Sequence, residues 1–219
     1  MKILCVSDQI DPLVYSNNIK ERFAGIDLIL GAGDLPMDYI DFIVSSLNRP
    51  MLFVFGNHNL ENFRYYTKKT NTHYLFADKD RFYGSGAVHI HGKIKREEGL
   101  LIAGLGGCMK YNNGVNQFSN AGMTFEIIKL LPTLILNRIF SGRFLDILLT
   151  HASPLGIHDR KDICHRGFKC FLWFMRAFKP RYLVHGHIHL YDLSEVRTTQ
   201  FGSTMVINAY NHYLIDTEE

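Results

Sequence analysis

Short apolar runs alternate with polar and helix-spaced segments along the first quarter of the chain. Residues 3–6, 26–30 and 51–55 are almost continuously apolar, as is typical of strands that are buried on both faces. Residues 38–47 have apolar side chains at helical spacing, and a shorter helical segment ends near Phe23. Three buried strands separated by helices predict an α/β fold.

The pattern in the rest of the chain is less regular. We predict a polar turn at 93–98 between two strands, and a helix from about Gly122 in which Pro132 makes a kink or a junction. A second helix at 168–178 is apolar almost all round and is expected to be well buried. The remaining predicted strands are 87–90, 100–103, 144–149, 182–184, 192–196, 204–207 and 213–216.

Polar side chains follow the predicted strands at the points where these end. The stretches concerned are Asp8, Gly33-Asp34, Gly56-Asn57-His58, His151 and His185-Gly186-His187-Ile188-His189. In an open α/β sheet, sites form at the carboxyl ends of the strands. Side chains two apart on an extended backbone share a face, so His187 and His189 are delivered to one point. Carboxylates, an amide oxygen and imidazoles suit a pair of divalent transition ions, so the strand ends predict a metal site.

Composition narrows the class of protein. A chain of 219 residues, 47% of them hydrophobic, predicts one domain spanning residues 1–219. The net charge of +3 is too balanced to indicate a nucleic-acid-binding protein. Four cysteines without a CxxC spacing are expected to be free thiols of a cytoplasmic protein. The first apolar run is too short for a signal peptide, and no segment predicts a transmembrane helix, so no membrane partner is expected.

The ordered motifs from Asp8 to His189 resemble those of the calcineurin-like metallophosphoesterases, in particular small single-domain bacterial or archaeal members. The resemblance implies an αββα sandwich, in which two packed mixed β-sheets are flanked by helices and a dinuclear metal centre lies at the sheet edge. It implies that Asp34 bridges the two metals and that His58 lies beside the scissile phosphate, as a hydrogen-bond donor or leaving-group acid. The remaining implied ligands are Asp8 and His189 for the first metal, and Asn57, His151 and His187 for the second.

The function implied by this resemblance is metal-dependent hydrolysis of a phosphodiester or a phosphomonoester. A hydroxide bridging two divalent metals would attack the phosphorus. Manganese is the first expectation for these metals, with iron, zinc or nickel as alternatives. The substrate would be a small phosphoester or a nucleotide. Two other functions stay open: a non-catalytic metal-binding scaffold of the same fold, and a nuclease, which rests on seven basic residues between Arg160 and Arg181.

The first motif departs from the family pattern. A histidine usually stands two residues after the first aspartate, whereas this chain has Ile10, which cannot coordinate a metal. Water, Asp11 or Tyr15 are the candidate replacements, and we predict a weaker first metal site rather than a lost one.

The resemblance also suggests residues around the substrate. Residues 101–117 are similar to the strand and loop that line the pocket in small bacterial members. The candidate substrate contacts in this stretch are Lys110, Tyr111, Asn112 and Asn113. His158 and His165 follow the ligand His151 in the chain and are candidates for capping the pocket, whereas His185 is expected to be a structural histidine.

Overall fold

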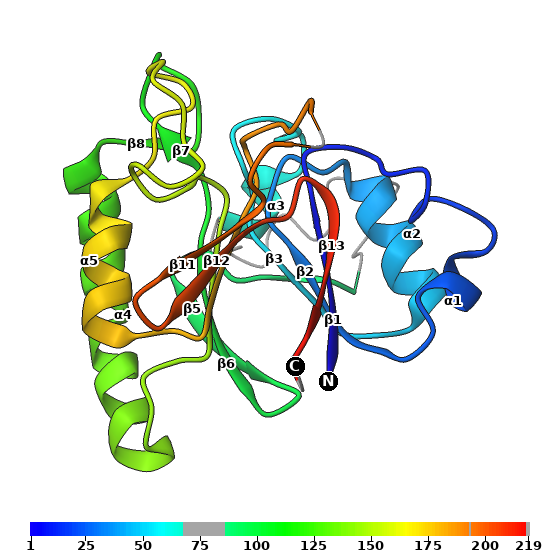
Figure 1. Cartoon of the computed structure of the whole chain (residues 1–219), viewed down its shortest axis with the longest axis horizontal. Helices are drawn as coiled ribbons and strands as arrows, with labels where there is room; N and C mark the ends of the chain where they lie inside the picture. The colour runs from blue at the N-terminus through cyan, green and yellow to red at the C-terminus, as the bar shows by residue number, and fades with distance from the viewer. Residues whose placement is uncertain (68–85, 193, 218–219) are drawn as a thin grey trace, which may run out of the picture.

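The computed structural model describes residues 1–67, 86–192 and 194–217, and the fold below refers to these residues (Figure 1). The first sheet has the strand order β13-β1-β2-β3-β4, in which β1 to β4 are parallel and β13 is antiparallel to β1. The last strand of the chain therefore pairs with the first. The bounds are Lys2–Ser7 (β1), Ile26–Gly31 (β2), Met51–Phe53 (β3), Val88–His89 (β4) and Asn211–Asp216 (β13).

The second sheet has the order β11-β12-β10-β9-β6-β5. Its four inner strands are parallel, and β11 and β5 pair antiparallel at the two edges. The bounds are Lys93–Glu97 (β5), Leu100–Leu105 (β6), Ile147–Thr150 (β9), Tyr182–His185 (β10), Thr198–Phe201 (β11) and Thr204–Asn208 (β12). A small separate pair joins β7 (Cys108–Met109) to β8 (Gln117–Phe118).

Helices cover the outer face of each sheet, as Figure 1 shows. One hydrophobic cluster, with Leu30 and Val184 among its members, fills the space between the two sheets. A second lies between the first sheet and α1 and α2, and a third lies between the second sheet and α4 and α5. The layers are therefore α-β-β-α, as the resemblance implied. The helix bounds are Ile19–Arg22 (α1), Met37–Leu47 (α2), Phe63–Thr67 (α3), Asn120–Ser141 (α4) and Lys169–Phe178 (α5).

Local sequence explains where the long helix α4 begins and ends. Ser119 caps its start, because its hydroxyl accepts a hydrogen bond from the Gly122 N–H at 3.0 Å. Gly142 ends it in the left-handed conformation, with φ 72°. Pro132 does not divide the helix, which continues through it to Ser141. Of the two predicted alternatives, the junction at Pro132 was therefore wrong.

Three other predictions differ from the structure. The polar segment at 93–98 is mostly strand β5, because an edge strand needs few apolar side chains when only one neighbour pairs with it. The expected strand at 192–196 is absent from its described residues, where the Tyr191 N–H instead donates to the Glu195 carboxylate at 2.9 Å. Helix α5 is not buried all round, since Trp173 is 46% exposed.

The four cysteines are free thiols, as expected. Among the described residues, no helix is both long and apolar enough to cross a membrane.

Candidate metal centre

The loops that follow five parallel strands meet at one edge of the two sheets. The Asp8 N–H donates to the Gly33 carbonyl at 3.1 Å, which joins the ends of β1 and β2. The Gly186 N–H donates to the His151 carbonyl at 3.0 Å, which joins the ends of β10 and β9. The two sheets are connected by the His187 N–H, which lies 2.9 and 3.0 Å from the two carboxylate oxygens of Asp8. Residues distant in sequence therefore converge as predicted from the strand ends.

The residues expected for the second metal form the tightest group. Asp34, His151 and His187 are buried and offer ligand atoms that all lie within 4.8 Å of one another. The Nε2 atom of His151 is 3.4 Å from Oδ2 of Asp34 and 3.2 Å from Oδ1 of Asn57. The structure thus brings together all four residues that were predicted to surround this ion.

A backbone carbonyl engages one ring nitrogen of each of these two histidines. The Nδ1 atom of His151 lies 2.8 Å from the Ala32 carbonyl, and the Nε2 atom of His187 lies 2.8 Å from the Cys164 carbonyl. A carbonyl can only accept, so a neutral ring must carry its hydrogen at these atoms. The other nitrogen, Nε2 of His151 or Nδ1 of His187, is then unprotonated and available to a metal.

Among the residues expected for the first metal, His189 is more exposed to solvent than the histidines of the second group. Nε2 of His189 lies 3.9 Å from Oδ1 of Asp8, whose side chain is fully buried. The His189 ring stacks on Tyr210 with centroids 4.9 Å apart, and its Nδ1 is 3.1 Å from the hydroxyl of Tyr191. The aromatic neighbours hold the ring in place, and both tyrosines went unnoticed in the sequence because no motif marks them.

Neither protein residue proposed as a replacement at Ile10 is directed to this site. The Asp11 carboxylate lies 2.5 Å from Nδ1 of His212 on β13 and accepts the Leu13 N–H at 2.8 Å, so both of its oxygens are engaged elsewhere. Tyr15 packs edge-on against Tyr39 and Phe42, beside α2. These two expectations are therefore corrected, and of the three candidates only water is left.

Three glycines leave the space that the ligands occupy. A Cβ at Gly33 would lie 2.4 Å from Nδ1 of His151, and one at Gly56 would lie 2.1 Å from Oδ1 of Asp34. A Cβ at Gly186 would lie 1.8 Å from the Ser7 hydroxyl and 2.6 Å from Oδ2 of Asp8. A side chain at any of these positions would displace a predicted ligand, which explains why glycines accompany these motifs.

Three of the predicted metal ligands have a strained backbone conformation. Asp8, Asp34 and His187 have φ values of 67°, 56° and 68°, in the left-handed region that costs most residues energy. Non-glycine residues in this region concentrate at functional sites, because surrounding contacts must hold them there. The surrounding contacts therefore hold the backbone of three of the six predicted ligands in a conformation that is otherwise unfavourable.

The charge distribution fits a cation. Burial raises the pKa of Asp8, although His151 and the Ser7 hydroxyl act in the opposite direction. Burial also acts to raise the pKa of Asp34, but His151 and the His58 N–H outweigh it and leave that pKa below its usual value. In the described part of the chain, the ion pairs of these two carboxylates involve only histidines. Two desolvated carboxylates without a lysine or arginine partner would gain from a bound metal ion.

Metal binding is expected to release a proton from His151. Burial alone would lower the pKa of this ring, but the carboxylates of Asp34 and Asp8 raise it to about 9. At pH 7 the metal-free ring is therefore protonated, and a metal can bind only after the proton leaves. We expect manganese affinity to rise with pH up to about 9, where the ring becomes neutral. Calorimetric titration at pH 7 in buffers of different ionisation enthalpy measures the release, and a buffer-independent heat would contradict it.

His58 stands outside the group of ligands. Its N–H donates to Oδ1 of Asp34 at 2.7 Å, while its side chain is exposed to solvent. The neighbouring Asn59 contributes a bond that the sequence did not predict, from its amide to the Asp34 carbonyl at 2.9 Å. The backbone of this segment thus positions Asp34 and leaves the imidazole of His58 free to reach a substrate.

Of the candidate substrate contacts, Tyr111 is bonded to a predicted metal ligand. Its hydroxyl accepts a hydrogen bond from the Asn57 amide at 3.5 Å, which turns the amide oxygen toward His151. Asn112 bonds within its own loop, to Gly114 and Gln117, and Asn113 is exposed. Lys110 lines a cleft of about 500 Å³ together with Arg166 and Lys169. Of these four candidates, only Tyr111 has a described contact with a predicted metal ligand.

The histidines after His151 have different surroundings. The His165 ring lies against that of His187, with centroids 5.2 Å apart, and so borders the second group. His158 instead bonds to His185, with 2.9 Å between Nδ1 and Nε2, and burial lowers the pKa of both rings. His185 thus has the structural surroundings expected of it, and His158 bonds to His185 and to the Thr199 hydroxyl.

Two supporting contacts carry no sequence signal. The guanidinium of Arg160 donates to the His189 carbonyl at 2.7 Å, and the Asn116 amide donates to the carbonyls of Phe55 and Gly56 at 3.1 and 2.6 Å. Both use backbone acceptors, which a sequence pattern does not reveal.

Comparison with solved structures shows a shared fold at low sequence identity. One crystal structure aligns with a TM-score of 0.64 and 12% identity, over 99% of this chain and 95% of that chain. The crystal structure of TT1561 of Thermus thermophilus aligns with a TM-score of 0.62 and 15% identity, over 96% of this chain and 89% of that chain. The comparison with curated proteins finds no match.

The comparison with family models identifies the family. The model described as calcineurin-like phosphoesterase matches residues 1–191, which include every motif from Asp8 to His189. Membership indicates a metal-dependent hydrolase of phosphoric esters. The chain belongs to the calcineurin-like phosphoesterase family.

Proposed function

We propose that the chain hydrolyses a phosphodiester, in a small molecule or a nucleotide, with the help of two divalent metal ions. The observation that carries this proposal is the buried group of Asp34, His151 and His187, with ligand atoms within 4.8 Å of one another. Asn57 adds a carbonyl oxygen 3.2 Å from His151. Manganese is the ion we favour, because this mixture of carboxylate, amide and imidazole ligands suits it.

The family resemblance implies the roles of the ligands. Asp34 would be shared between the two ions, Asp8 and His189 would complete the first set, and His151, His187 and Asn57 would complete the second. The weaker of the two is expected to be the first, because Ile10 offers no ligand and His189 is only partly buried. When bound, two such ions neutralise charge on phosphoryl oxygens and activate water as a nucleophile.

The chain's own residues would hold the metal ligands in place and contact the substrate. The backbone N–H groups of His187 and His58 hold the carboxylates of Asp8 and Asp34 in place. The exposed imidazole of His58 can donate a hydrogen bond to the phosphate and a proton to the departing oxygen. Tyr111, which contacts Asn57, would contact the substrate, and so would Lys110 from the neighbouring cleft.

Hydrolysis of bis(p-nitrophenyl) phosphate and p-nitrophenyl phosphate by the manganese-loaded protein tests the preference for diesters. A higher kcat/KM for the diester supports the proposal. A preference for the monoester would assign the chain to phosphomonoesterases instead, and equal inactivity on both would remove the enzymatic proposal.

Replacing His58 by alanine is expected to lower kcat by about 10²- to 10⁴-fold without changing the number of bound manganese ions. The reason is that the side chain is exposed and only its backbone N–H contacts Asp34. If His58 protonates the leaving group, the loss should be smallest for diesters with acidic leaving groups. A His58→Ala variant that keeps full activity on diesters of unactivated alcohols would contradict this role.

One observation favours the scaffold alternative. The carboxylate of Asp11, the nearest acidic replacement for the missing histidine, is bonded to His212 instead. A chain that binds a single manganese ion and lacks activity would fit a scaffold. The nuclease alternative has less support, because its basic residues are paired or spread out. Arg160 pairs with Glu195. Lys169 and Lys179 lie at opposite ends of α5, which places them about 15 Å apart at 1.5 Å per residue.

A further inference from the structure

His158 and His185 are bonded to each other and to two further groups. Nδ1 of His185 lies 2.9 Å from the Gly186 carbonyl, and its Nε2 lies 2.9 Å from Nδ1 of His158. Nε2 of His158 lies 2.9 Å from the hydroxyl of Thr199 on β11. Burial lowers the pKa of His158 to about 4 and that of His185 to about 3, so both rings are neutral at pH 7.

The carbonyl at one end of this series determines where each hydrogen lies. A carbonyl can only accept, so Nδ1 of His185 carries the ring hydrogen and its Nε2 accepts. His158 then donates from Nδ1, which leaves its Nε2 to accept the Thr199 hydroxyl. Every bond is therefore directed from Thr199 toward the Gly186 carbonyl, and no other arrangement of two neutral rings satisfies all three contacts.

The peptide between Gly186 and His187 connects this series to a predicted metal ligand. In the described part of the chain no peptide bond is cis, so the Gly186 carbonyl and the His187 N–H point to opposite sides of one rigid plane. The carbonyl accepts from His185 on one side. On the other side, the N–H lies 2.9 and 3.0 Å from the two carboxylate oxygens of Asp8. The His185 ring therefore fixes the peptide plane that holds Asp8.

The turn at His187 is strained and needs such support. Its φ is 68°, and the Ile188 N–H donates to the Gly186 carbonyl at 2.8 Å across it. A three-residue turn of this hand is rare, and a strained backbone persists only where the surrounding contacts determine it. The ring of His185 is a second donor to the same carbonyl. His158 has a φ of 58°, so its own backbone is also held in an unfavourable conformation.

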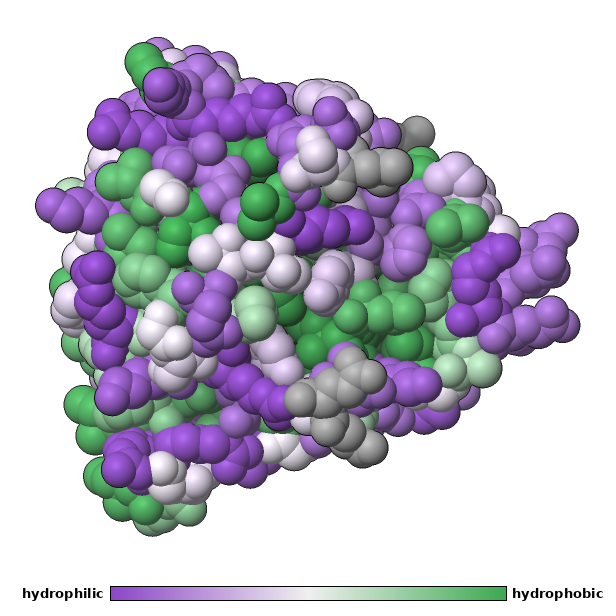
Figure 2. All heavy atoms as spheres, viewed as in Figure 1, coloured by the Kyte–Doolittle hydropathy of each residue, from purple (hydrophilic) through white to green (hydrophobic). Residues whose placement is uncertain are grey.

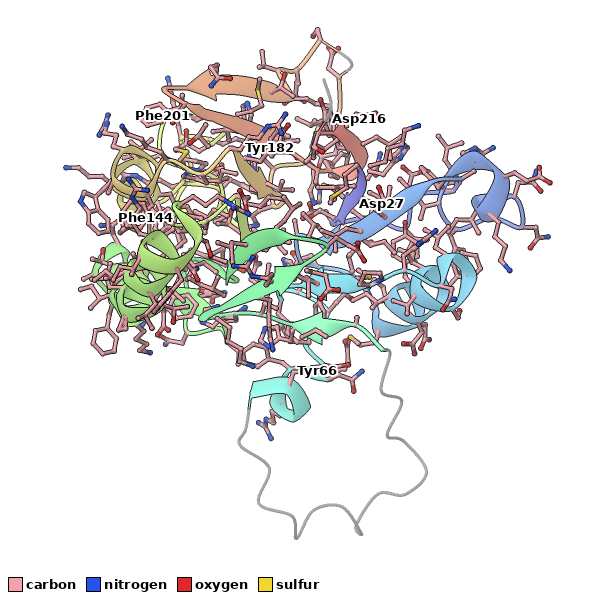
Figure 3. The ribbon with its side chains drawn as sticks, turned by 90° about the horizontal axis from the view of Figure 1, so that it is seen from below. Asp27, Tyr66, Phe144, Tyr182, Phe201 and Asp216 are labelled. Atoms are coloured by element: carbon pink, nitrogen blue, oxygen red, sulfur yellow. The ribbon has the colours of Figure 1, made fainter. Side chains whose placement is uncertain are left out.

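The ring of His158 joins two strands that are not neighbours. His158 lies in the segment between β9 and α5, which Figure 1 shows beside β7 and β8, and hydrophilic residues predominate at the upper edge of the same view in Figure 2. Figure 3 shows Tyr182 and Phe201, the first residue of β10 and the last of β11, at the same end of the second sheet. Strand β12 lies between these two strands. His158 therefore links His185 on β10 to Thr199 on β11 across β12.

We propose that His158 is a positioning residue for the metal centre: through His185 it fixes the Gly186–His187 peptide and thereby the carboxylate of Asp8. The consequence for metal binding rests on the proposed two-metal function, whereas the bonds themselves do not depend on a metal. Because Ile10 offers no ligand to the first metal, the orientation of the remaining ligands decides how well that ion is held.

Hydrogen exchange of the His187 amide in the metal-free protein, measured by NMR, tests the positioning directly. His158→Gly removes the ring, and glycine adopts a φ of 58° without strain. We expect the His187 amide to exchange about two- to tenfold faster in this variant, because one supporting hydrogen bond is lost. The rate is taken relative to the amide of Leu148 in the buried strand β9, which reports any general loss of stability.

Added imidazole separates the hydrogen bond from the space that the ring fills. His158 and Thr199 line a cleft of about 340 Å³, through which imidazole can reach the vacated position in His158→Gly. Imidazole should restore slow exchange, whereas 1-methylimidazole has no N–H to donate to His185 and should not. Glu98→Gly, a replacement by glycine at an exposed residue with φ 48°, is the matched control and should leave the exchange unchanged.

Manganese titration connects the inference to the proposed function. His158→Gly should weaken binding of the first, weaker ion by about 10- to 100-fold, as is typical when a partner of a metal ligand is removed. The second ion should be affected less, because the Cys164 carbonyl also holds the His187 ring, at 2.8 Å. A wild-type chain that binds one ion would remove the two-metal proposal, and the exchange of the His187 amide would still decide the role of His158.

Two results would overturn the proposal. One is a His187 amide that exchanges at the wild-type relative rate in His158→Gly. The other is imidazole that restores slow exchange no better than 1-methylimidazole, which would show that the ring does not act through its N–H. Should His158→Gly fail to fold, Thr199→Val gives the same test, because it keeps the ring and removes only its donor. Thr199→Val should then speed the exchange and Thr199→Ser should not, and equal rates in these two variants would also overturn the proposal.

Discussion

Replacing Asp34 by asparagine is expected to remove metal-dependent hydrolysis and to reduce the number of manganese ions bound per chain. Asp34 is buried, lies 3.4 Å from His151 and is the carboxylate that both proposed ligand sets share. Even a residue that only supports a metal ligand contributes about 10- to 100-fold to affinity or activity, so we expect a loss of at least about 100-fold here. Calorimetric titration and hydrolysis of bis(p-nitrophenyl) phosphate measure the two effects.

The control for this variant is Asp38→Asn, the same change at an exposed residue in the first turn of α2. It should leave both the manganese stoichiometry and the activity unchanged. A neutral asparagine also removes the charge that keeps the pKa of His151 high, so the D34N protein should release fewer protons when metal binds. An Asp34→Asn protein with two tight manganese sites and normal activity would show that the ligand sets are assigned wrongly.

Replacing Gly56 by alanine is expected to damage the centre by steric displacement alone. The added Cβ would stand 2.1 Å from Oδ1 of Asp34 and 2.5 Å from Nε2 of His151, closer than real Cβ atoms approach. Moving these buried side chains should cost about 1–3 kcal/mol of unfolding free energy and should weaken the second metal site. Thermal unfolding of the metal-free protein and manganese titration give the two readouts.

Gly122→Ala serves as the matched control. This glycine lies in α4, and an added Cβ would have only an ordinary contact, at 3.4 Å from the Ser119 hydroxyl. Alanine should be neutral there or stabilise the helix by up to about 1 kcal/mol. If Gly56→Ala behaved like Gly122→Ala in both measurements, the space beside Asp34 would not limit the site.

The sequence predicts the inner part of this fold well. Continuous apolar runs such as 3–6 and 26–30 lie in central parallel strands. A strand that is buried on both faces is apolar at every position, so it is easy to recognise in a sequence. The polar residues that follow the predicted strands, from Asp8 to His189, could therefore be assigned to the edge of the sheets where these strands end. The structure brings them together, although their roles in catalysis remain predictions.

The parts that sequence did not predict depend on contacts between distant segments. Nothing near Asp11 indicates that His212, 201 positions later, will bond to its carboxylate. Strand β5 is held by pairing with β6 rather than by its own polar sequence. The helix predicted at 168–178 was expected to be well buried because it is apolar almost all round, but the packing of α5 on the second sheet decides which of its faces is buried.

The claim that this chain is a two-metal phosphodiesterase is tested most directly by titrating manganese into chelator-treated protein during hydrolysis of bis(p-nitrophenyl) phosphate. Asp34→Asn protein prepared in the same way gives the background. We predict negligible activity without metal and a rise that saturates at two equivalents of manganese per chain. Activity that is independent of manganese, saturation at one equivalent, or rates no higher than those of Asp34→Asn would contradict the account.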